Sequence, residues 1–136
     1  MEEKIRKRKI VLVGTGFVGM SFAYSLLSEK GINELILIDM NKDKAVGEQM
    51  GLSDGLPYAD SKMTIKAGDY DECKDADIVV VTAGAAQKPG QTRLELVTIN
   101  AKITKDVATQ IKNSGFNGIM VVASNPVDIM TYVAYR

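Results

Sequence analysis

Three glycines near the amino terminus have the spacing of a phosphate-binding turn. Gly14, Gly16 and Gly19 form a G-x-G-x-x-G pattern, which follows the apolar run 10–13 and opens a helical pattern. In such a turn the first glycine permits the tight bend, the second lets a pyrophosphate approach the backbone, and the third lets helix and strand pack closely. The helix N-terminus then offers free N–H groups and a partial positive charge to the phosphates. The pattern therefore predicts a dinucleotide-binding turn.

An aspartate follows the next apolar run at the distance expected for a ribose contact. Asp39 lies twenty residues after Gly19, directly after the apolar residues 35–38. A carboxylate at this place accepts hydrogen bonds from the adenosine ribose and repels the 2′-phosphate of NADP, and no arginine stands beside it. The sequence therefore favours NAD over NADP. The alternative is a solvated aspartate at the end of a strand.

The glycine-containing stretch 84–93, G-A-A-Q-K-P-G-Q-T-R, is the second place where chemistry is expected. It follows the mainly apolar run 78–82, and ligands bind at the carboxyl ends of strands in open parallel sheets. Gly84 and Gly90 are suited to hinge a lid, and Arg93 stands at its end. An arginine there would stabilise the negative charge that grows on a carbonyl oxygen as a hydride arrives. The alternative is that Arg93 is simply an exposed residue of a helix's first turn.

Charge and composition exclude several other functions. The 136 residues have a formal net charge of zero, a single cysteine at position 73 and no histidine. The balanced charge offers no general attraction for nucleic acid or an anionic membrane, and no apolar run approaches membrane-spanning length. One thiol cannot form an internal disulfide or a zinc cluster, which favours a cytoplasmic location. Without an imidazole we expect no metal site and no histidine acid–base chemistry within these residues.

Short apolar runs alternate with helical patterns, so the elements that position these residues can be predicted. The runs lie at 10–13, 35–38, 63–66, 78–82 and 119–123, and the helical patterns at 17–30, 42–52, 93–114 and 127–136. The runs lack apolar–polar alternation, which is typical of strands covered on both faces by helices. We therefore predict an α/β fold with a doubly wound parallel sheet of the Rossmann type and about five strands.

Local signals predict where the helices begin and which faces turn inward. Asn41 is suited to cap the second helix, Asp69 a short turn, and Thr92 to Glu95 have the form of a capping box. The apolar spacing predicts inward faces in the first and third helices, made respectively by Val18, Phe22 and Leu26, and by Leu96, Ile99, Ile103, Val107 and Ile111.

Five stretches taken together resemble the L-lactate and malate dehydrogenase family, and its lactate members most closely, over the whole chain. They are G-T-G-F-V-G, L-I-L-I-D, D-A-D-I-V-V-V-T-A-G, A-Q-K-P-G-Q-T-R-L-E-L-V and A-S-N-P-V-D-I-M-T-Y. The resemblance implies NAD as cofactor and pyruvate or lactate as substrate. The cofactor-binding positions that it implies are Gly14, Gly16, Val18, Gly19, Asp39, Lys44, Tyr70, Gly84, Ala85, Ala123 and Asn125.

The resemblance also implies which residues meet the substrate. Gln87 matches the position where malate enzymes carry an arginine that pairs with the second carboxylate of oxaloacetate. Because an arginine fork binds a carboxylate bidentately and glutamine cannot, Gln87 points to pyruvate. Arg93 matches the mobile catalytic arginine, which also touches the substrate. Asn125 matches an asparagine that touches substrate and nicotinamide, and Asp128 lies in the same motif.

In the family, the catalytic histidine, its aspartate and a second arginine lie beyond the equivalent of Arg136, as do the sixth strand and the substrate domain. We therefore expect residues 1–136 to form an NAD-binding domain that is incomplete at its C-terminus and inactive alone, with an uncovered apolar edge at 119–123. For the full-length protein, the resemblance implies a homo-oligomer, often a tetramer. Three alternatives stay open: a nucleotide-binding module without catalysis, an enzyme of the malate dehydrogenase type, and a structural decoy or truncated gene product without a function.

Overall fold

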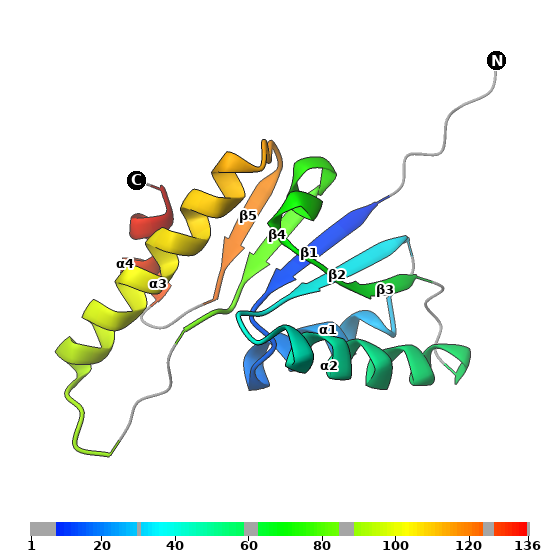
Figure 1. The fold of residues 1–136 in the computed structure, drawn as a ribbon, viewed down its shortest axis with the longest axis horizontal. Coiled ribbons are helices and arrows are strands. Elements are labelled where there is room, and N and C mark those ends of the chain that lie inside the picture. Colours follow the sequence, from blue (N-terminus) through cyan, green and yellow to red (C-terminus); the bar gives the residue numbers. More distant parts are fainter. Residues whose placement is uncertain (1–7, 30, 59–62, 85–88, 124–126, 136) are drawn as a thin grey trace.

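A parallel sheet with the strand order β3-β2-β1-β4-β5 forms the centre of the molecule (Figure 1). The computed structural model describes residues 8–29, 31–58, 63–84, 89–123 and 127–135, and within them the sheet has five strands. These are β1 (Lys9–Val13), β2 (Glu34–Ile38), β3 (Thr64–Ala67), β4 (Ile78–Val81) and β5 (Ile119–Val122). All paired strands run parallel, so the predicted doubly wound α/β fold is confirmed.

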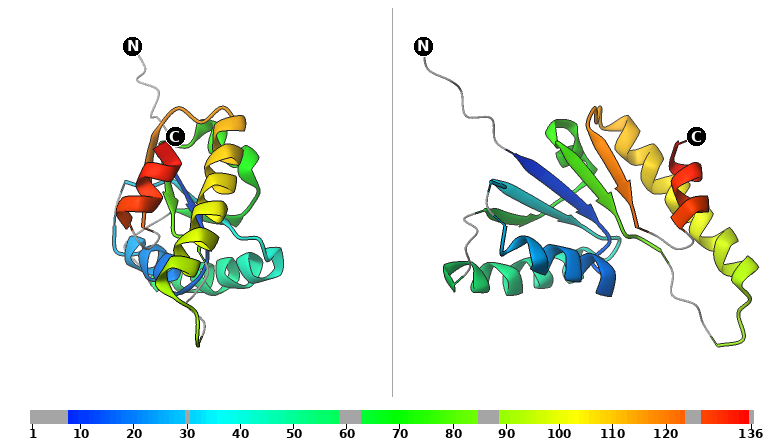
Figure 2. Two further views of the ribbon diagram at one scale, coloured as in Figure 1. Left: turned by 90° about the vertical axis from the view of Figure 1, so that its left-hand side faces the viewer. Right: turned by 180° about the vertical axis from the view of Figure 1, so that it is seen from behind.

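Helices cover both faces of this sheet. One face packs against α1 (Phe17–Leu26) and α2 (Lys42–Gly55), and the other against α3 (Arg93–Asn113). The last helix, α4 (Val127–Tyr135), lies next to α3 beside β5 (Figure 2). Two short 3₁₀ helices, η1 (Leu56–Tyr58) and η2 (Tyr70–Asp75), follow α2 and β3. Among the described segments, no helix combines the length and apolar character needed to cross a membrane.

The central strand β1 explains why the apolar runs do not alternate. Ile10 and Leu12 pack with α1 and α2, whereas Val11 and Val13 pack on the α3 side. All five residues of β1 are buried, so both faces of the strand must be apolar except where a specific pairing compensates. The expectation of a sheet covered on both faces is therefore correct for the central strands.

The first helix differs from the prediction in its end and in its inward face. It ends at Leu26, four residues before the predicted end, because Ser28 and Glu29 donate to carbonyls three residues back and tighten the last turn. Its buried residues are Gly19, Ala23 and Leu26, whereas Val18 is 59% exposed. Leu26 is therefore buried as predicted and Phe22 packs partly buried on the core, but Val18 does not turn inward. The small residues Gly19 and Ala23 are buried instead and bring the helix close to the sheet beside the glycine turn.

The long helix α3 begins at Arg93 as predicted. The Thr92 hydroxyl accepts from the Glu95 N–H at 3.2 Å, and the Glu95 carboxylate accepts in return from the Thr92 N–H at 3.4 Å. Its buried residues are Asn100, Thr104, Val107 and Ile111.

The inward face of α3 is therefore only partly the predicted one. Val107 and Ile111 are buried as expected and Ile103 packs partly buried on the same core, but Ile99 is exposed and the polar residues Asn100 and Thr104 are buried. Asn100 lies against Gly84, and the Thr104 hydroxyl contacts the Met130 sulfur of α4 at 3.3 Å. At Asn100 and Thr104 the helix packs on a turn and on another helix rather than on the sheet, so these two positions do not follow the apolar spacing.

Of the other two predicted caps, the structure contains the one at Asn41 but not the one at Asp69. The Asn41 side chain accepts from the Lys44 N–H and caps α2 as expected. Asp69 precedes η2, but its side chain makes no capping hydrogen bond and instead forms an ion pair with Lys42 at 3.2 Å. The cap predicted at Asp69 is therefore wrong, because a cation from α2 lies within reach of the carboxylate.

Candidate dinucleotide-binding site

A cavity of about 650 Å³ opens at the carboxyl ends of β1, β2 and β4. The glycine turn at 14–16, Asp39 at the end of β2, Gly84 after β4 and the side of α3 all line it. In the sheet, β1 stands between β2 and β4, so the connections from β1 and β4 leave toward opposite faces. Open α/β sheets bind ligands at such a switch point.

The three glycines of the turn differ in what surrounds them. Gly14 has a φ of 102°, and a Cβ there would lie 2.7 Å from the Ala83 nitrogen. A Cβ on Gly19 would overlap the Gly14 carbonyl oxygen. A Cβ on Gly16 would meet no described atom within 4 Å. The first and third glycines are therefore required by the fold itself, whereas the second leaves open space at the cavity.

The N-terminus of α1 is turned toward this open space. Gly16 is the N-cap residue, and the helix has neither a side-chain capping bond nor an acidic residue in its first turn. The first helical bond runs from the Met20 N–H to the Gly16 carbonyl at 2.9 Å. A helix end of this kind presents donors and a partial positive charge, which suits a phosphate.

Asp39 is held by three backbone and side-chain donors. Its Oδ2 accepts from the Thr15 N–H at 2.9 Å and from the Thr15 hydroxyl at 2.6 Å, and its Oδ1 accepts from the Asn41 N–H at 2.9 Å. Burial acts to raise the pKa of Asp39, but these hydrogen bonds and the charge of Lys44 outweigh it and hold the pKa below the usual value. The site therefore presents an ionised and oriented carboxylate.

Of the other predicted cofactor residues that the structure describes, some line this cavity and others do not. Lys44, Tyr70 and Gly84 line it together with Asp39. Burial raises the pKa of Tyr70 to about 12, so its phenol is neutral near pH 7. Val18 lies exposed on α1 and does not line the cavity, and Ala123 is half-buried after β5, where its N–H donates to the Val81 carbonyl at 2.8 Å.

The substrate half of the predicted site is only partly described. Arg93 is exposed at the first position of α3 and does not line the cavity. Ala85, Gln87 and Asn125 lie outside the described residues. Asp128 belongs to the first turn of α4, but the structure does not describe its side chain.

Two threonines that the sequence analysis did not single out support the glycine turn. Thr15 is 1% exposed and bonds to Asp39, and the Thr82 hydroxyl donates to the Gly14 carbonyl at 3.0 Å. The only signal for Thr15 was its place between the first two glycines. Neither pairing follows from local sequence, because the partners lie 24 and 68 residues apart.

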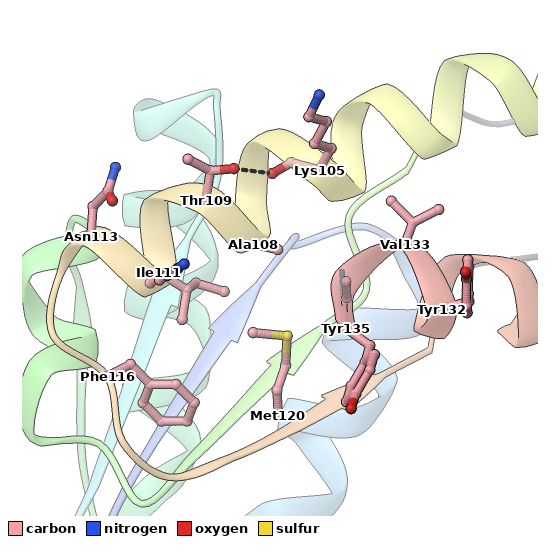
Figure 3. A pocket seen from close by; sticks show the side chains of 12 residues that line it. Lys105, Ala108, Thr109, Ile111, Asn113, Phe116, Met120, Tyr132, Val133 and Tyr135 are labelled. Carbon is pink, nitrogen blue, oxygen red and sulfur yellow. Dashed lines mark hydrogen bonds between the residues drawn. The ribbon is translucent and has the colours of Figure 1, made fainter.

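A second cavity of about 810 Å³ lies between α3, β5 and α4 (Figure 3). Ile111, Phe116, Met120 and Tyr135 line its apolar part, and on its rim the Thr109 hydroxyl donates to the Lys105 carbonyl at 2.7 Å. None of the predicted site residues that the structure describes lines it, and the glycine turn and Asp39 lie at the other cavity.

The parallel sheet, the glycine turn and the carboxylate at the end of β2 together define a Rossmann dinucleotide-binding domain. Residues 8–136 match the family model described as lactate/malate dehydrogenase, NAD binding domain. The chain therefore belongs to the lactate/malate dehydrogenase family, and the cofactor of this domain is NAD. The open space at Gly16 and the ionised Asp39 fit the pyrophosphate and the ribose of that cofactor.

Two relatives of similar sequence are L-lactate dehydrogenases. The chain is 58% identical over 133 residues to L-lactate dehydrogenase 2 of Lactococcus lactis subsp. lactis, covering 98% of this chain and 42% of the relative. It is 53% identical over 133 residues to L-lactate dehydrogenase 2 of Enterococcus faecalis, with the same coverage. The chain thus spans 42% of the length of these relatives.

Solved structures of the family share this architecture. The minor L-lactate dehydrogenase of Enterococcus mundtii in its ligand-bound form superposes with a TM-score of 0.91 at 52% identity, covering 95% of this chain and 41% of that one. The malate dehydrogenase of Archaeoglobus fulgidus in complex with NADH superposes with a TM-score of 0.88 at 41% identity, covering 93% and 44%.

Proposed function

We propose that this chain is the NAD-binding domain, residues 1–136, of an L-lactate dehydrogenase that interconverts pyruvate and lactate. The observation that carries the choice of substrate is the uncharged Gln87 within the loop motif of 84–93. The identity of 58% to a lactate dehydrogenase, against 41% to a malate dehydrogenase structure, supports the same choice. On the family resemblance we also propose a cytoplasmic role in glycolysis and fermentation and a homotetrameric full-length protein.

In this proposal the glycine turn and Asp39, which Thr15 joins by two hydrogen bonds, bind neighbouring parts of NAD. The N-terminus of α1 receives the pyrophosphate beside Gly16, and the Asp39 carboxylate accepts from the adenosine ribose hydroxyls. Bound NAD supplies the hydride acceptor and, when reduced, the hydride donor. Further cofactor contacts are assigned to Val18, Lys44, Tyr70, Gly84, Ala85, Ala123 and Asn125.

Arg93 is assigned the catalytic role within these residues. It stands directly after the loop that contains Gln87, at the start of a helix whose capping box holds the first turn in place. A guanidinium brought to the substrate oxygen stabilises the negative charge that develops there during hydride transfer. Gln87, Asn125 and Asp128 complete the proposed substrate contacts.

The proton that accompanies the hydride needs a donor, and the 136 residues contain no histidine. We therefore expect residues 1–136 alone to bind NAD but to reduce pyruvate at no measurable rate. The measurement is NADH oxidation with pyruvate, after NADH binding to the same preparation has been shown by fluorescence titration. Turnover at the rate of an intact lactate dehydrogenase would contradict the assignment of roles.

The choice of substrate is tested in the longer protein that carries this domain. We expect its kcat/KM to be higher for pyruvate than for oxaloacetate, and Gln87→Arg to reverse that order because arginine pairs with the second carboxylate. Lys88→Arg serves as a control, because it places a guanidinium one position away from residue 87 without changing the net charge of the loop. A wild-type preference for oxaloacetate would instead support the malate dehydrogenase type, and binding without turnover would support a nucleotide-binding module.

A further inference from the structure

Thr15, the residue between the first two glycines of the turn, is buried under the turn and faces Asp39. It is 1% exposed, although it belongs to the wall of the cavity. Both of its donors, the backbone N–H at 2.9 Å and the hydroxyl at 2.6 Å, reach the same oxygen, Oδ2 of Asp39. Hydrogen bonds to an ionised acceptor are stronger than neutral ones, so this pair holds the carboxylate firmly.

The remaining capacity of the Asp39 carboxylate follows from counting its donors. A carboxylate has about four lone-pair positions, two on each oxygen. Thr15 occupies both positions on Oδ2, and the Asn41 N–H occupies one on Oδ1 at 2.9 Å. Among the described residues, one acceptor position therefore remains, and it lies on Oδ1.

We propose that Thr15 is a positioning residue for cofactor selection: it holds Asp39 so that Oδ1 is left for a ribose hydroxyl of NAD and the negative charge is kept against the 2′-phosphate of NADP. The inference rests on the proposed role of Asp39 in the cofactor site. The backbone N–H would be available from any residue, so the selective part is the hydroxyl. Without it, Asp39 keeps its charge but loses one of two bonds that restrain its orientation.

The test compares the affinities of the 136-residue chain for NAD and NADP by calorimetric titration. Thr15→Val keeps the shape of the side chain and removes the hydroxyl. We expect it to weaken NAD binding roughly fivefold to tenfold, as for one ordinary hydrogen bond, with a smaller change for NADP. The preference for NAD over NADP therefore falls. Thr15→Ser retains the hydroxyl and should keep the wild-type preference.

Two controls separate positioning from general support of the fold. Thr104→Val makes the same chemical change at a threonine that is also 1% exposed but lies outside this cavity, so it should leave the cofactor preference unchanged. In an Asp39→Asn background, Thr15→Val should no longer alter the preference, because the charge it orients is gone. If Thr15→Val does not fold, Thr15→Ala makes the same comparison without β-branching.

The outcomes are distinct. An equal loss of NAD and NADP affinity in Thr15→Val, with the preference unchanged, would overturn the inference and leave the proposed function intact. The same would follow if the effect persisted at full size in the Asp39→Asn background. If the wild-type chain bound neither dinucleotide, the inference and the proposed cofactor site would both fall.

Discussion

At the scale of single residues, the glycine turn shows that one sequence pattern can contain separate requirements. Gly14 needs a positive φ and lies against the backbone of Ala83, and Gly19 lies against the Gly14 carbonyl. Gly16 has an ordinary φ of −77° and open space around it. Folding therefore depends on the outer two glycines, whereas we assign the middle one to the ligand.

Alanine substitutions in the turn should separate these requirements. Gly16→Ala should leave the free energy of unfolding within about 0.5 kcal/mol of wild type, because the added methyl meets nothing and the φ suits alanine. It should weaken NAD binding by roughly tenfold or more, since the methyl occupies the space proposed for the pyrophosphate. Gly19→Ala should lower the free energy of unfolding by about 1–3 kcal/mol, because the methyl overlaps backbone.

Urea denaturation measures the first quantity and NADH fluorescence titration the second. Gly47→Ala is a matched control, because Gly47 lies within α2 and a Cβ there also meets nothing within 4 Å. It should leave NADH binding unchanged. Unchanged NADH affinity in Gly16→Ala would refute the role assigned to Gly16.

At the scale of elements, the amino end of β1 is tied to η2 by a buried lysine. Lys9 is 5% exposed, and its Nζ lies 2.7 Å from Glu72 Oε2 and 2.6 Å from Asp75 Oδ1. Burial acts to lower the pKa of Lys9, but hydrogen bonds and charges from Asp75 and Glu72 outweigh it and raise the pKa. The two acids are exposed enough to be hydrated without Lys9, whereas the ammonium is not.

Removing the lysine and removing the two acids should therefore lower the free energy of unfolding by unequal amounts. Lys9→Met leaves hydrated carboxylates and a well-packed side chain, so we expect a loss of about 1 kcal/mol or less in the free energy of unfolding. The double variant Glu72→Gln and Asp75→Asn leaves a buried ammonium without its ion pairs and should cost about 2–3 kcal/mol. Urea denaturation measures both, and equal losses would contradict the argument.

Lys66→Met is the control for Lys9→Met, because Lys66 is exposed and lies 3.9 Å from Glu34. It should change stability by less than about 0.5 kcal/mol.

The pH dependence of stability supplies a second check. The folded pKa of Lys9 is raised, so its stabilisation is present below its ordinary pKa of 10.5 and is lost as the pH rises through the folded value. Lys9→Met should lack that alkaline loss.

At the scale of the whole molecule, the two faces of the sheet are covered unequally near β5. Val121 lies beside Val80 in the register, on the face that α1 and α2 cover at the other strands. There Ile119 is 66% exposed and Val121 is 45% exposed, whereas Met120 packs on the α3 side. Within the described residues β5 pairs only with β4, so this face combines exposed apolar side chains with an open strand edge.

We expect this region to drive self-association of the 136-residue chain, because an open apolar edge strand pairs readily with another chain. Sedimentation velocity over a range of concentrations should show dimers or larger species. The double variant Ile119→Lys and Val121→Lys should remain monomeric, whereas Val46→Lys on α2 should behave as the wild type does. A wild-type chain that stays monomeric at every concentration would refute the expectation.

The sequence alone determined the order of the elements, the glycine turn, the place of Asp39 at the end of β2, and the caps at Asn41 and Thr92. These features depend on apolar period and on bonds within a few residues, so a linear pattern contains them. Only the tertiary structure decided which side of α1 turns inward, that Thr15 holds Asp39, and that Lys9 is buried against η2. The contacts of Thr15 with Asp39 and of Lys9 with Asp75 join residues 24 and 66 positions apart, and they exist because the sheet places β1 between β2 and β4.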